Sequence, residues 1–142
     1  MNELSGMRIV MYFTAFFLLL VTTATKAQQH TDLIGEWTIN NITGIPAEPS
    51  AAIKKTVDAL LKSQFRFDKD GRFTLIAPEK NMAINASNWK YDAGTKTIII
   101  DQADMSGDFV VVMKILVKQE SGNWIFLPDI YPYELEMRKQ VK

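Results

Sequence analysis

The chain has 142 residues, which is enough for one domain with one hydrophobic core. Its 16 basic and 16 acidic residues balance, so no excess of positive charge favours binding to nucleic acid or to an anionic membrane. The lack of cysteine and the single histidine, His30, exclude thiolate catalysis, disulfide bonds and zinc sites built from Cys or clustered His. We therefore expect a domain held by apolar packing and backbone hydrogen bonds, with no resident metal ion and no cofactor.

Residues 1–27 are expected to form a secretory signal peptide. Arg8 supplies the positive charge near its start, and Ile9 to Val21 form its apolar centre. Thr25-Lys26-Ala27 then places small residues on both sides of a lysine, which is typical of a cleavage site ahead of Gln28. The remaining domain is therefore expected to begin at residue 28.

The leader also indicates the start of translation and the localisation of the protein. Met7 suits the start of a signal peptide better than Met1, because residues 2–6 include an acidic side chain. The apolar run of about thirteen residues is shorter than the ~20 with which a helix spans a bilayer, so an uncleaved anchor is the disfavoured alternative. We expect an exported protein, periplasmic or secreted, without a stable membrane anchor after cleavage.

Residues 28–142 are expected to form one all-β domain with mainly antiparallel strands. Residues 28–32 are polar and are expected to be a loose arm. The first strand is predicted over Leu33–Ile42, with Trp37 and Ile39 on one face because strand side chains alternate. The glycine and prolines that follow this segment end the strand.

A helical period replaces the alternation after residue 49. Apolar side chains recur three and four positions apart, and charged side chains occupy the opposite face. Ser50 stands where a helix N-cap is expected. We predict one amphipathic helix over residues 50–63 that lies against the sheet or across one mouth of a barrel. Its apolar positions are Ile53, Val57, Leu60 and Leu61.

The rest of the chain alternates in short segments that are separated by turns. Asp68-Lys69-Asp70-Gly71 and Asp92-Ala93-Gly94-Thr95 are typical of hairpin turns. With the first strand, these segments give eight strands joined as successive hairpins, which predicts an eight-stranded up-and-down antiparallel barrel. A flattened or partly open sheet packed on the helix is the alternative. The further strands are predicted over Gln64–Asp68, Arg72–Ala77, Ala86–Tyr91, Lys96–Asp101, Phe109–Lys118, Trp124–Pro128 and Tyr133–Gln140.

The start of the first strand, Gly35-x-Trp37, together with the strand pattern and the leader, resembles the lipocalins and their calycin relatives. In that family the Trp packs at the closed end of the barrel beneath an Arg near the end of the last strand. The resemblance therefore implies that Trp37 and Arg138 close the barrel. The helix between the first two strands departs from lipocalins and lies where fatty-acid-binding proteins insert a helical portal. The chain is similar to small exported lipocalin-like proteins, and no family ligand can be transferred to it.

One row of large side chains is expected to face the interior if Trp37 does. An eight-stranded barrel is wide enough to be filled by side chains or to hold one small ligand. The hydroxyl groups of Tyr91 and Tyr133 would then supply polar tips near its open end. A packed core without a cavity is the alternative. The residues expected to line a ligand site are Phe67, Trp89, Tyr91, Met113, Trp124 and Tyr133.

Two functions follow, neither of them enzymatic. The first is an exported binding module that holds a small apolar or amphipathic molecule in the barrel mouth. The second is an interaction or structural protein with a filled barrel and partner contacts on loops or the outer face. Val110, Val112 and Leu116 favour the second function, because with them the long strand is apolar on both faces. The alternative explanation is that the helix over residues 50–63 covers the outer face.

Acidic residues offer little further chemistry. Glu134 and Glu136 share the solvent face of the last strand, where nothing separates their pKa values for acid–base catalysis. The aspartates at positions 101, 104 and 108 match no established calcium-binding loop, and aspartate is common in turns because it hydrogen-bonds its own backbone. We expect no metal site and no enzyme.

Overall fold

The computed structural model describes residues 30–142, and the expected leader over residues 1–27 lies outside the described residues. The chain divides into two units, Met1–Leu33 and Ile34–Lys142. Residues 30–33 form one helical turn. The first strand begins at Gly35, so the prediction that it begins at Leu33 is wrong. Within residues 30–142, no helix is both long enough and apolar enough to cross a membrane.

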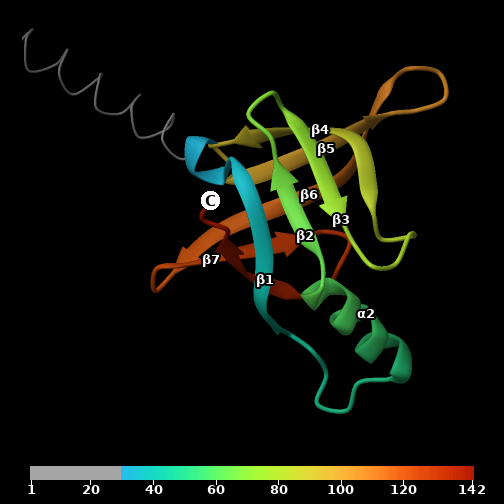
Figure 1. Cartoon of the computed structure of the whole chain (residues 1–142), viewed down its shortest axis with the longest axis vertical. Coiled ribbons are helices and arrows are strands. Elements are labelled where there is room, and N and C mark those ends of the chain that lie inside the picture. The colour runs from blue at the N-terminus through green and yellow to red at the C-terminus, as the bar shows by residue number, and fades with distance from the viewer. Residues whose placement is uncertain (1–29) are drawn as a thin grey trace, which may run out of the picture. The chain divides into compact units, whose positions relative to one another are not determined.

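The Ile34–Lys142 unit is a closed antiparallel barrel whose eight strands follow one another in chain order (Figure 1). Each strand pairs with its neighbours in the sequence, and β8 returns to pair with β1. The prediction of an eight-stranded up-and-down barrel is confirmed, and the open sheet is excluded. This architecture is compatible with a lipocalin-like barrel. The strands are β1 (Gly35–Thr43), β2 (Gln64–Phe67), β3 (Arg72–Ile76), β4 (Ile84–Asp92), β5 (Thr97–Ala103), β6 (Phe109–Glu120), β7 (Asn123–Pro128) and β8 (Glu134–Lys139).

Helix α2 (Ala51–Leu61) lies between β1 and β2 in the chain, as predicted, and packs against β1. Its first turn is capped by Ser50, whose hydroxyl accepts a hydrogen bond from the Ile53 N–H at 3.3 Å. Leu60 is fully buried, whereas Leu61 is 44% exposed. The apolar face of α2 is therefore narrower than the helical period predicts.

The interior is built from the side chains that alternate inward along the strands. The five largest side chains without significant exposure are Trp37, Phe65, Phe67, Phe73 and Phe126. Their rings lie in tilted and edge-to-face pairs, with centroids 5.1–6.4 Å apart. Such pairs are the favoured aromatic geometry, and each ring buries on the order of 150–250 Å². Rings contributed by β1, β2, β3 and β7 therefore fill this part of the barrel.

The hairpin of β5 and β6 is longer than predicted. β5 continues to Ala103, which pairs with Phe109, so that only residues 104–108 remain as the loop. In Figure 1 this loop, drawn in orange, extends beyond the neighbouring strands. The tip of this hairpin therefore lies away from the hydrophobic core.

A bulge at Val112 changes which side chains of β6 face the interior. Ile100 pairs with Met113, but the next pair is Asp101 with Val111, so Val112 is an extra residue on β6. Paired residues of antiparallel strands point to the same face, and Val111 therefore shares the outer face of Asp101. Unbroken alternation along β6 predicts that Val111 shares a face with Met113, and the bulge makes that prediction wrong.

Candidate functional site

The six side chains expected to line a ligand site differ in how much of each reaches solvent. The ring centroid of Phe67 lies 5.2 Å from that of Trp89 and 5.1 Å from that of Phe73. Phe67 is fully buried, so its ring packs against other rings and leaves no room for a ligand between them. Four of the six are buried, namely Phe67, Trp89, Met113 and Tyr133, and two are half-buried, namely Tyr91 and Trp124.

Two of the polar tips on this inner row have identified surroundings. The Trp89 Nε1–H donates a hydrogen bond to the Asp68 carbonyl oxygen at 2.9 Å, so it holds the β2–β3 turn against β4. Burial raises the pKa of the Tyr91 hydroxyl above its usual value, and the negative charge of Asp92 adds to this effect. The Tyr91 hydroxyl is therefore protonated at neutral pH and can donate a hydrogen bond.

The cation over the Trp37 ring is Lys139, whose Nζ lies 5.6 Å from the ring centroid. Arg138 is exposed and donates a hydrogen bond to Asn40 Oδ1 at 2.7 Å. The expectation that Arg138 covers Trp37 is wrong, because alternation along β8 places Met137 and Lys139 on one face and Arg138 on the other. Trp37 itself is fully buried.

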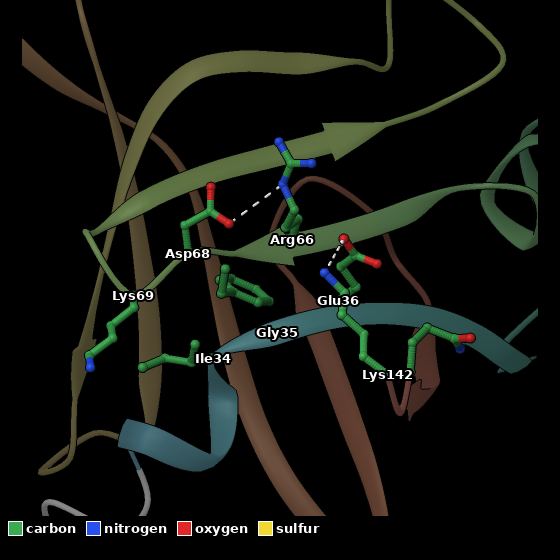
Figure 2. Close-up of a pocket in the computed structure, with 9 residues that line it drawn as sticks. Ile34, Gly35, Glu36, Arg66, Asp68, Lys69 and Lys142 are labelled. Carbon is green, nitrogen blue, oxygen red and sulfur yellow. Dashed lines mark ion pairs between the residues drawn. The ribbon is translucent and has the colours of Figure 1, made fainter.

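A pocket of ≈ 400 Å³ opens on the surface beside Gly35 (Figure 2). The start of β1, the end of β2 and the C-terminal tail contribute its walls. Phe67 is the one member of the buried ring cluster that lines it, so the pocket ends above that cluster and does not continue into it. Its lining residues are Ile34, Gly35, Glu36, Arg66, Phe67, Asp68, Lys69, Gln140 and Lys142.

The charges around this pocket largely compensate one another. Arg66 Nε lies 3.6 Å from Asp68 Oδ1, and Lys142 Nζ lies 3.5 Å from Glu36 Oε1; Figure 2 draws both pairs. Both distances are longer than a hydrogen bond, and both lysine and arginine side chains reach solvent, so each pair contributes about 0–1 kcal/mol. With Lys69 as the remaining cation, the pocket has no strong preference for a charged ligand.

The β5–β6 hairpin presents apolar side chains to solvent. Phe109 is 66% exposed, Val110 is 45% exposed and Val111 is 53% exposed. Met105, in the loop, is fully exposed. A single exposed apolar residue needs no explanation, but a contiguous group on a projecting hairpin is typical of an interaction surface.

Helix α2 does not remove this exposure. It packs against β1, which β8 and β7 separate from β6 in the strand order, and it leaves Val111 and Leu116 on the outer face of β6 53% and 38% exposed. The explanation that the helix covers the outer face of β6 is therefore wrong. The sequence indicates that β6 is apolar on both faces, but no local pattern indicates that its first residues extend beyond the packed interior.

The acidic loop at the tip of this hairpin is organised by Asp104. The Asp104 carboxylate accepts hydrogen bonds from the backbone N–H groups of Ser106 at 2.8 Å and Asp108 at 3.0 Å. Desolvation is the largest single influence and acts to raise the pKa of Asp104, but the hydrogen bonds from Asp108, Ser106 and Gly107 together outweigh it and lower the pKa below 3.8. Asp104 therefore acts as a turn former, in keeping with its position between two paired strands.

Acidification is expected to loosen this loop. The folded-state pKa of Asp104 is lowered, so the carboxylate supports the loop above the unfolded value of 3.8, and this support is lost as the pH falls through the folded-state pKa. In an NMR titration, the amide shifts of Ser106 and Asp108 should change with the Asp104 carboxyl, at a midpoint below 3.8. Asp104→Ala should abolish the joint response. A midpoint at or above 3.8 would show that these amides do not stabilise the carboxylate.

Other polar groups of the barrel are engaged with one another on its outer face. Glu136 Oε1 accepts a hydrogen bond from Asn40 Nδ2 at 2.8 Å.

Among residues 30–142, no three His, Asp or Glu side chains lie close enough together to hold a metal ion. Comparisons of the chain with models of protein families, with curated proteins and with solved structures found no match.

Proposed function

We propose that this chain is an exported, non-enzymatic interaction module in which the barrel is a packed scaffold and the β5–β6 hairpin contacts a partner. The observation that carries the proposal is the exposure of Phe109, Val110 and Val111 at the start of β6. Apolar side chains that remain exposed on a projecting element gain free energy when a partner removes them from water. The hairpin is therefore the part of the barrel best suited to binding.

The packing of the interior supports this proposal over a small-molecule carrier. Trp37, Phe67 and Phe126 are fully buried against one another, with ring centroids 5.4 Å apart for Trp37 and Phe126 and 6.1 Å apart for Phe67 and Phe126. A ligand that entered among them would have to displace rings at the density of a protein core. Tyr91, which is half-buried, favours the alternative of a small apolar ligand at the barrel mouth, whereas the half-buried Trp124 packs on Trp37.

Export is proposed from the leader. Arg8, the apolar segment Ile9 to Val21 and the small residues around Lys26 have the order of a cleavable signal peptide. Many exported domains depend on disulfide bonds, and this chain has no cysteine. Its barrel is closed by backbone pairing and filled by apolar side chains, so it does not need a disulfide bond. A partner met after export would find the hairpin already folded.

Site-specific photocrosslinking in the organism that encodes the chain tests this function. A photoreactive amino acid replaces Val110 in one variant and Ile76 in the control; the two side chains are 45% and 47% exposed, and Ile76 lies on β3. We expect a discrete crosslinked product from position 110 and none from position 76. The proposal is wrong if position 110 gives no product or if both positions give the same products.

A further inference from the structure

One edge of β6 has no strand beside it over its first residues. β6 pairs with β5 over Phe109–Leu116 but with β7 only over Ile115–Glu120. The ladder to β7 is closed at Lys114, whose N–H donates to Asp129 Oδ1 at 2.9 Å and whose carbonyl accepts from the Asp129 N–H at 2.8 Å. Within residues 30–142, no strand pairs with the β7-facing edge of Phe109–Met113.

This edge has the properties of a strand that accepts another strand. Phe and Val have high strand propensity, and Phe109, Val110 and Val111 are exposed. Natural edge strands are usually protected by lysine, proline or inward-pointing charges, and the run from Phe109 to Val111 contains none of these. The bulge at Val112 ends the regular backbone, so the edge available for pairing is Phe109–Val111.

The charges that flank this edge indicate which occupant it fits. Asp108 precedes the exposed run and Lys114 follows it. If the run pairs antiparallel with itself, the acidic end in one copy lies toward the basic end in the other. The acidic loops, which include Asp104 and Asp108, then point in opposite directions, whereas parallel pairing would bring them together. A strand that pairs with this edge should itself carry exposed apolar residues. The segment Phe109–Val111 of a second copy meets this requirement.

We propose that Phe109–Val111 pairs antiparallel with the same segment of a second copy, which joins two barrels through their β6 edges. This inference rests on the proposed function and names its partner. Such an interface is isologous, because the same patch contributes from both copies. The segment is short, so the interface is at the small end of known sizes, and we expect a dissociation constant on the order of 10–100 µM.

Sedimentation equilibrium over a concentration series tests this pairing. Val111→Lys places two like charges close to the two-fold axis and should weaken association by at least about tenfold. Leu116→Lys is the matched control: it lies on the same strand and is 38% exposed, but both edges of β6 are paired there, so association should be unchanged. A wild-type chain that stays monomeric at about 1 mM, or a dimer that Val111→Lys leaves unchanged, overturns the proposal.

A charge exchange tests the antiparallel alignment. In the proposed register Asp108 of one copy and Lys114 of the other lie two positions apart along the strands, so Asp108→Lys and Lys114→Asp should each weaken association several-fold by bringing like charges together at both ends of the interface. The double variant should restore the wild-type dissociation constant. Failure of the double variant to restore it overturns the alignment.

The crosslinking at position 110 separates this inference from the proposed function. A crosslinked product with twice the mass of the chain supports both. A product that contains a different protein supports the proposed function and overturns pairing with a second copy. No product at position 110 overturns the function itself.

Discussion

Trp37→Ala should lower the free energy of unfolding by about 3–5 kcal/mol, the cost of removing a large aromatic side chain from a packed core. Trp37 is fully buried, and its ring lies 5.4 Å from Phe126 and 5.5 Å from Trp124, measured between centroids. Replacing it with alanine leaves a cavity that the closed ladder of the barrel cannot collapse to fill. Urea denaturation of the two proteins measures the difference.

Trp124→Ala is the matched control for this prediction. Trp124 contacts the same ring but is half-buried, so its removal should cost less, about 1–2 kcal/mol. Equal costs for the two substitutions, or a cost below about 1 kcal/mol for Trp37→Ala, would contradict the view that Trp37 anchors the packed end of the barrel.

Gly35→Ala should destabilise the barrel by about 1.5–2 kcal/mol, because two independent obstacles oppose it. Gly35 has a φ of +137°, which side chains with a Cβ rarely adopt. A Cβ at this position would also lie 2.9 Å from Lys139 Cε, so it would displace the cation that covers Trp37. Thermal unfolding of the variant measures the combined cost.

Two further variants separate the two obstacles. Gly122→Ala tests positive φ without a steric clash, because Gly122 has a φ of +81° and a Cβ there would meet nothing within 4 Å; it should cost about 1 kcal/mol. In a Lys139→Ala background, the cost of Gly35→Ala should fall by about 0.5–1 kcal/mol, the value of the displaced cation–π contact. An unchanged cost in that background would show that Lys139 contributes nothing to the effect.

The strand pattern was largely readable from the sequence because both periods in it are strong. Alternation between Gly- and Asp-containing turns predicted all eight strands, and the helical period with Ser50 as N-cap predicted α2. The barrel followed from short successive connections. The strand ends were less readable, since pairing of Ala103 with Phe109 depends on a partner strand and not on local propensity.

The candidate site was readable only in part, and the reasons are specific. Alternation along β8 places Lys139 on the same face as Met137, so the sequence itself indicates that Lys139 is the cation near Trp37. The family resemblance implied Arg138 instead, and that expectation was wrong. The outward turn of Val111 had no such signal, because the bulge at Val112 arises from the register between β5 and β6. The free edge of β6 likewise depends on where β7 ends.

We infer that the barrel interior is filled by its own side chains and propose that binding occurs through the β5–β6 hairpin. Native mass spectrometry of the chain purified from its own organism tests this claim most directly. We predict the mass of the polypeptide alone and of complexes with a second polypeptide copy, which Val111→Lys removes. A small-molecule adduct in stoichiometric amount, released when the barrel unfolds and unaffected by Val111→Lys, would contradict the claim.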